Sequence, residues 1–164
     1  MRTVLVIDPG PTRSAAVIWD GEKIHDHHIT ENAAIRAWLA AQMHMDPPAL
    51  VALEMVQSFG MPVGRDVFET VLQVGRLQEL CEGRTQCRLI YRGQVKIHVC
   101  HSARARDSNI RAALIDRFGV PGTKKAPGLT HGLRADEWQA FALAVPARDT
   151  RQTLGAASLA GPSS

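Results

Sequence analysis

The chain has 164 residues, 45% of them hydrophobic, and a formal net charge of +3 at pH 7, which is typical of one domain with a buried core. No apolar run approaches the roughly 18 residues of a membrane span and the N-terminus lacks a signal-peptide pattern, so we expect a cytoplasmic protein with no membrane partner. The three cysteines form no C-x-x-C motif, which argues against a disulfide framework or a zinc ribbon.

The first third of the chain predicts three short strands, a helix and a fourth strand. The Asp20-Gly21 pair indicates a hairpin turn between the second and third strands. Thr30 or Asn32 can cap the helix, whose apolar residues recur at helical spacing. The five elements are expected, in this order, at residues 3–8, 14–19, 23–29, 30–44 and 49–54.

The rest of the chain predicts a long helix, a fifth strand, a short extended piece and two further helices. Val67, Val71, Val74 and Leu77 form an apolar stripe on the long helix, which is either core packing or part of a dimer interface. We divide the chain into a domain at residues 1–147 and a flexible tail at 148–164. The elements are expected at residues 65–83, 86–92, 94–100, 105–119 and 135–145.

Two of the predicted strands end in a carboxylate, Asp8 and Glu54. A turn of Asp8, Pro9 and Gly10 would account for the first without any chemistry. If the two strands are parallel neighbours, both carboxylates lie at one edge of the sheet, where Asp136 in the first turn of the last helix can join them. Carboxylates at close quarters raise one another's pKa unless a cation intervenes, and such oxygen ligands suit Mg²⁺ or Mn²⁺.

Positive charge is concentrated in one part of the chain. Residues 84–134 contain eleven Lys or Arg and two Asp, a net charge of +9, so the rest of the chain has a net charge of −6. Such a segment suits a polyanion, although it can also be a solvated basic surface without a partner. Lys124 and Lys125 lie in a Gly/Pro-rich stretch and fit contacts with phosphates.

The order of the elements predicts an α/β fold, a mixed five-stranded sheet with an antiparallel three-strand meander and helices on both faces. Residues 3–145 resemble the RuvC-type Holliday-junction resolvases of the RNase H-like superfamily. The sequences of the motifs are most similar to those of the small phage and prophage members. Four stretches carry the resemblance: VLVIDPGPTRSAAVIWDG, ALVALEMV, VKIHVCHSARARDSNIRAALIDRFG and RADEWQAFALAV.

The resemblance implies an RNase H-like fold, a homodimer, and two divalent metal ions that cleave phosphodiesters in branched double-stranded DNA. It implies that Asp8, Glu54 and Asp136 are metal ligands. It also implies that the protein works in a bacterial or phage-infected cell. The family's fourth ligand is expected three residues before Asp136, where this chain has Leu133. His131, two residues further upstream, is the candidate for that role.

The resemblance also implies roles for residues outside the carboxylate cluster. Lys96 matches a catalytic lysine before the penultimate helix, Arg106 a basic residue at the start of that helix, and Phe59 an aromatic wedge in the loop after Glu54. The residues that we assign to DNA contact are Phe59, Arg65, Arg104, Arg106, Lys124 and Lys125.

Three alternatives stay open at this point. Leu133 is compatible with a module that binds DNA and has lost catalysis. The stretch DPGPTRS also resembles the phosphate loop of sugar kinases and actin, but that fold needs about twice this length and a second Gly-rich loop. A zinc site in HVCH is disfavoured because His98 and Cys100 would point away from His101 in an extended segment.

Overall fold

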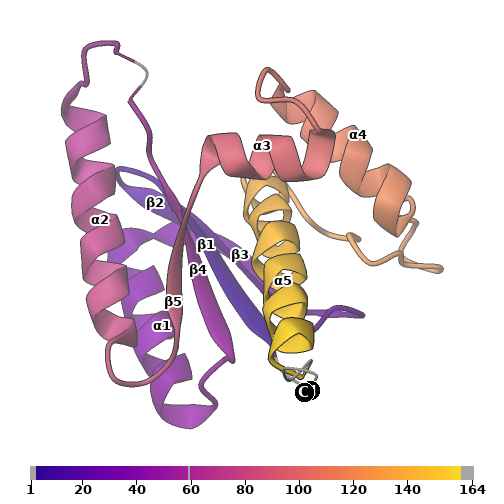
Figure 1. The fold of residues 1–164 in the computed structure, drawn as a ribbon, viewed down its shortest axis with the longest axis horizontal. Coiled ribbons are helices and arrows are strands. Elements are labelled where there is room, and N and C mark those ends of the chain that lie inside the picture. The colour runs from indigo at the N-terminus through magenta and orange to yellow at the C-terminus, as the bar shows by residue number, and fades with distance from the viewer. Residues whose placement is uncertain (1–2, 59, 160–164) are drawn as a thin grey trace, which may run out of the picture.

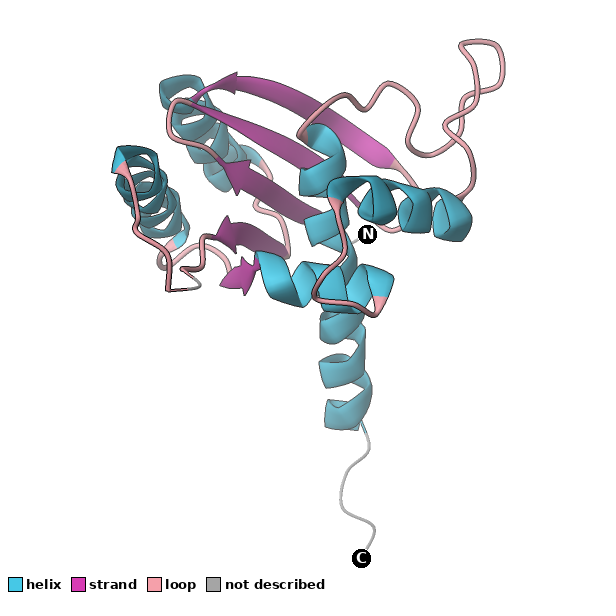
Figure 2. Cartoon of the chain, turned by 90° about the horizontal axis from the view of Figure 1, so that it is seen from above, coloured by secondary structure: helices cyan, strands magenta, loops and turns pink. Residues whose placement is uncertain are grey.

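The computed structural model of the protein describes residues 3–58 and 60–159, with side chains described up to residue 150 (Figure 1). A central sheet separates two layers of helices, as the view from above also shows (Figure 2). The elements are β1 (Val4–Pro9), β2 (Arg13–Trp19), β3 (Ile24–Glu31), α1 (Asn32–Met45), β4 (Leu50–Met55), α2 (Arg65–Cys81), β5 (Cys87–Tyr91), α3 (Arg92–Cys100), α4 (Asp107–Phe118) and α5 (Glu137–Leu159).

The sheet is mixed, as the sequence predicted. Its strand order is β3-β2-β1-β4-β5, and β2 is antiparallel to both β1 and β3, which makes these three strands a meander. β4 pairs in parallel with both β1 and β5. β1 and β4 lie inside the sheet with both faces covered, which explains why their sequences are continuous apolar runs rather than alternating ones.

Alternate residues of β1 face two different cores. Leu5 and Ile7 pack under α1 and α2, whereas Val4 and Val6 pack under α3, α4 and α5. The second core contains the aromatic side chains of Trp19, Phe118 and Phe141. The Trp19 ring lies edge-on to both phenyl rings, with centroid distances of 5.6 Å to Phe118 and 5.3 Å to Phe141. This aromatic cluster joins α4 and α5 to the sheet.

The segment 94–100 is helical, so the extended conformation predicted for it is wrong. It belongs to α3, where the backbone N–H of Tyr91 donates to Oε1 of Gln94 over 2.8 Å at the start of the helix. Val95, Ile97 and Val99 alternate along the sequence as they would in a strand, whereas in the helix Val95 is the buried residue. Among the described residues, no group of three or more His, Cys, Asp or Glu side chains is placed to hold a metal ion in HVCH or elsewhere.

The last helix is longer than predicted. α5 continues through Pro146 to Leu159, so residues 148–159 of the expected tail are helical, and residues 160–164 lie outside the described part of the chain. Proline in a helix interior normally costs about 3 kcal/mol. Leu143, Val145 and Ala147 are fully buried against the sheet around Pro146, and this packing outweighs the local preference.

Some predicted ends are also wrong. β3 extends to Glu31, so Thr30 is a strand residue, and α1 has no side-chain cap. The Asn32 side chain instead donates to the carbonyl of Gly10 over 3.0 Å and so connects α1 to the loop after β1. None of the helices in the described part of the chain combines the length and apolarity that crossing a bilayer requires.

Candidate functional site

Asp8 and Glu54 lie side by side at the carboxyl ends of two parallel strands. Ile7 of β1 pairs with Leu53 of β4, so the next residue on each strand is one of the two acids. The parallel pairing on which the sequence prediction depended is therefore present. The edge formed by these strand ends is where open α/β sheets usually place their ligands.

The carboxyl group of Asp8 is in an environment that disfavours its charge. Burial, and next the negative charge of Glu54, raise the pKa of Asp8 to about 8, and the guanidinium of Arg92 opposes this rise. The negative charges of Asp136 and Asp107 act in the same direction as Glu54. Four carboxyl groups therefore lie close enough to interact, and no described residue donates a hydrogen bond to Asp8.

The raised pKa of Asp8 predicts that stability without divalent cations falls as the pH rises. The unfolded carboxyl releases its proton near pH 4 and the folded one near pH 8, so the folded state binds more protons across this range. We expect the metal-free wild type to lose a few degrees in Tm relative to Asp8→Asn between pH 4 and pH 8. Thermal unfolding of both proteins in EDTA measures the difference, and a difference that does not change with pH would contradict the prediction.

Glu54 is held by a basic side chain that the sequence analysis did not single out. Nη1 of Arg92, at the start of α3, lies 3.2 Å from Oε2 of Glu54, and Nη2 of Arg92 contacts Oδ1 of Asp107 at the start of α4. Burial raises the pKa of Glu54, while the charges of Arg92 and Lys96 lower it. The predicted catalytic lysine, Lys96, therefore lies within electrostatic reach of Glu54.

Asp136 stands immediately before α5 and is exposed. Its backbone carbonyl accepts hydrogen bonds from the N–H groups of Gln139 and Ala140, over 3.0 and 2.9 Å, and so begins the helix. Leu133 precedes the helix and is buried, with its carbonyl bound to the indole N–H of Trp138. A residue one helical turn before Asp136 is thus not on a helix.

Gln139, one helical turn after Asp136 and on the same helix face, was missed in the sequence. Its Oε1 is buried and has no hydrogen-bond partner within the described residues. The spacing of three residues from Asp136 was a signal that could have identified it. His131, the residue predicted for the fourth ligand, is exposed in a turn, and its backbone N–H donates to Gly128 over 3.1 Å.

Glu137, which is adjacent to Asp136, has a structural role. It is 2% exposed, and its carboxylate lies 3.0 Å from Nδ1 of His27 on β3 and accepts the backbone N–H of Arg134 over 2.7 Å. These contacts hold the start of α5 against the edge strand of the sheet. Glu137 therefore positions the helix that follows Asp136.

The donor set at the sheet edge fits a divalent cation. Asp8 and Glu54 supply hard carboxylate oxygens there, the ligand type that Mg²⁺ and Mn²⁺ prefer. A cation there would neutralise the mutual repulsion that raises the pKa of Asp8. Glu54 contacts Arg92, and within the described residues no group of three or more His, Cys, Asp or Glu side chains is placed to hold a metal ion.

The residues predicted to contact DNA are dispersed over the molecule. Arg104 and Arg106 are exposed in the α3–α4 loop, with Arg106 immediately before α4, and Arg65 begins α2. Lys124 and Lys125 are exposed in a tight turn closed by the bridge between Gly122 and Pro127. Figures 1 and 2 show α2 and the α4–α5 loop on opposite sides of the sheet. Phe59 lies outside the described residues.

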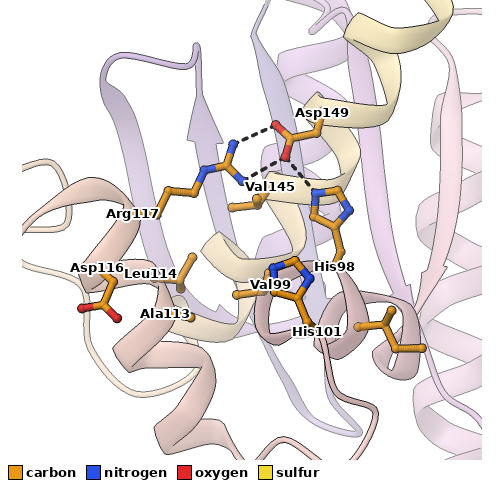
Figure 3. A pocket seen from close by; sticks show the side chains of 10 residues that line it. His98, Val99, His101, Ala113, Leu114, Asp116, Arg117, Val145 and Asp149 are labelled. Atoms are coloured by element: carbon orange, nitrogen blue, oxygen red, sulfur yellow. Dashed lines mark hydrogen bonds and ion pairs between the residues drawn. The ribbon is translucent and has the colours of Figure 1, made fainter.

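A cavity of about 790 Å³ lies between α3, α4 and α5 (Figure 3). Asp149 of α5 accepts two hydrogen bonds from Arg117 of α4, over 2.9 and 3.0 Å, and lies 2.8 Å from Nε2 of His98 on α3. The arginine and histidine contacts hold the pKa of Asp149 below its usual range despite burial. This cluster fastens three helices together and contains none of the carboxylates at the strand ends.

Comparison with known proteins identifies the fold. No protein-family model and no curated protein matches the sequence. The structure of T. thermophilus RuvC in complex with a Holliday junction substrate superimposes with a TM-score of 0.70 at 17% identity, covering 92% of this chain and 97% of that one. This chain has the RuvC fold. A second Thermus thermophilus RuvC structure gives a TM-score of 0.66 at 18% identity, over 90% and 96% of the two chains. The predicted RNase H-like architecture is therefore confirmed.

Proposed function

We propose that this protein is a divalent-metal-dependent endonuclease that cleaves phosphodiesters in branched double-stranded DNA, in the manner of a Holliday-junction resolvase. The observation that carries the proposal is the pairing of Asp8 and Glu54 at adjacent ends of parallel strands, with Asp136 close enough to act on Asp8. The fold supports it, because a RuvC structure with this architecture was solved with a Holliday junction substrate. The proposed setting is the cytoplasm of a bacterial or phage-infected cell.

Each residue of the site has a defined task in this proposal. Asp8, Glu54 and Asp136 hold two Mg²⁺ ions, for which Mn²⁺ can substitute, with His131 as a further candidate ligand. When bound, such ions activate a water molecule and stabilise the leaving oxygen. Lys96 places a positive charge beside Glu54, where it can stabilise the negative charge of the transferred phosphate.

The basic loops supply the proposed contacts with the DNA backbone. Arg104 and Arg106 lie in the loop before α4, whose first residue, Asp107, interacts with Asp8, so they are close along the chain to the carboxylates. Lys124 and Lys125 reach into solvent from a separate loop and suit the phosphates of a second duplex arm. Arg65, the first residue of α2, and Phe59, which lies outside the described residues, complete the proposed set.

We also propose that α2 forms a homodimer interface. Its buried face includes Val74 and Leu77, so part of the predicted stripe is core. Phe68, Val71 and Leu72 are 63%, 38% and 50% exposed, which is unusual for large apolar side chains on one helix. A second copy that covered this face would bury it, and two active sites could then cut opposing strands of one junction.

Leu72→Glu is expected to convert the dimer into a monomer, because it places a charge in the apolar face of α2. Sedimentation equilibrium of the wild type and the variant measures the change in mass. Val120→Glu is the matched control, since Val120 is 69% exposed after α4 and should leave the mass unchanged. A wild type that is monomeric at micromolar concentration would contradict the proposal.

The proposed function is tested by cleavage of a labelled four-way junction, with linear duplex as the control substrate and Mg²⁺, Mn²⁺ or EDTA in separate reactions. Paired nicks across the junction that require a metal ion are expected. The contact of Arg92 with Glu54 favours one alternative, a catalytically inactive DNA-binding module. Junction binding without cleavage under every metal condition would support that alternative.

A further inference from the structure

Arg92 serves several carboxylates of the site at once. Its side chain is 22% exposed, and its guanidinium contacts Glu54 of β4 through Nη1 and Asp107 of α4 through Nη2. It also interacts electrostatically with Asp8 of β1. One monovalent cation thus lies among acids from three elements, at the place where the donor set fits a divalent ion.

We propose that Arg92 is a tethered counter-ion that a divalent cation displaces from Glu54, while Asp107 keeps the displaced guanidinium beside the site. This inference rests on the proposed function in taking Asp8 and Glu54 as ligands of a divalent cation. The two partners of Arg92 differ in exposure to solvent. The Glu54 side chain is 14% exposed, and the Asp107 side chain is 68% exposed. Release from Glu54 therefore moves the guanidinium toward solvent without unpairing it.

The charges of the site explain why such a counter-ion is needed. Asp8 and Glu54 are both substantially buried, and together with Asp107 they would repel one another in the metal-free protein. A guanidinium is always protonated and holds two carboxylates through separate N–H groups, which an ammonium does less well. The same contact competes with metal binding, because Glu54 cannot offer the same oxygen to Arg92 and to a metal ion.

The proposal is tested by Mn²⁺ binding to the metal-free, full-length protein, measured by isothermal titration calorimetry. Arg92→Gln removes the competing cation and is expected to bind Mn²⁺ about fivefold or more tightly than the wild type. In EDTA its Tm should be lower, and the gain in Tm on adding Mn²⁺ should be larger. Arg84→Gln is the matched control, because Arg84 precedes β5 at the opposite end of the sheet and contacts His44.

Two further variants make the result decisive. Arg92→Lys keeps the charge but loses the double contact, so a smaller gain in Mn²⁺ affinity is expected, and it serves if Arg92→Gln does not fold. Equal or weaker Mn²⁺ binding by a folded Arg92 variant would overturn the proposal. Asp8→Asn should weaken Mn²⁺ binding. If Asp8→Asn weakens Mn²⁺ binding but the Arg92 variants bind Mn²⁺ no more tightly than the wild type, only the counter-ion proposal fails. If Asp8→Asn binds Mn²⁺ like the wild type, the proposed metal site fails as well.

Discussion

Asp8→Asn is expected to reduce metal-dependent cleavage of a four-way junction by at least about 10³-fold, the rate equivalent of several kcal/mol of lost charge stabilisation. The carboxyl lies level with Glu54 at the end of a buried strand. An amide of the same shape keeps the packing but removes the negative charge that a divalent ion requires. Single-turnover cleavage with saturating enzyme measures the loss of the chemical step.

The control for this experiment is Asp46→Asn. Asp46 is an exposed residue at the end of α1, before β4 begins, and so lies at the opposite end of the parallel strands. It should leave cleavage unchanged. Because Asp8 is destabilising when charged, Asp8→Asn should at the same time raise the Tm of the metal-free protein at neutral pH. Cleavage by Asp8→Asn at the wild-type rate would show that the reaction uses another site.

The mixed sheet and the edge that carries Asp8 and Glu54 were accessible from the sequence because both strands are buried on two faces. Each is a continuous apolar run that ends in an acid, and an acid at that point is conspicuous. The Asp-Gly pair identified the β2–β3 hairpin for a similarly local reason. Where the signal lies within a few residues, pattern and structure agree.

The errors arose where tertiary contacts outweigh local preference. Pro146 indicated the end of a helix, but the residues around it are buried against the sheet and α5 continues. The segment 94–100 has the apolar pattern of a strand, yet it belongs to α3, which begins at Arg92 directly after β5. Both cases depend on packing partners that are distant in the sequence and that no local pattern reports.

The site was predicted only in part for the same reason. Arg92 is 38 positions from Glu54 and 15 from Asp107, and no spacing rule connects them. It was one of eleven basic residues in a segment assigned to nucleic acid as a whole. Asp107 is the first residue of α4 and the second partner of Arg92. Their role depends on α3 and α4 meeting at the carboxylate edge.

Phe141→Ala is expected to lower the free energy of unfolding by about 3–5 kcal/mol, the second large effect. Phe141 is fully buried in α5, and its ring lies 5.3 Å from the centroids of both Trp19 and Phe118. Removal of the ring leaves a cavity between α5, the helix that directly follows Asp136, and the sheet. Urea unfolding should show a lower midpoint with an unchanged slope.

Phe141→Leu separates the loss of volume from the loss of the aromatic ring. It nearly conserves the packed volume, so its cost should stay below about 1.5 kcal/mol if cavity formation dominates. Equal costs for the two variants would assign the stability to the ring contacts with Trp19 and Phe118 instead. Asp136 directly precedes α5, so a cavity under this helix should also loosen Asp136 and weaken Mn²⁺ binding by the folded protein. This expectation links the packing of the core to the carboxylate site.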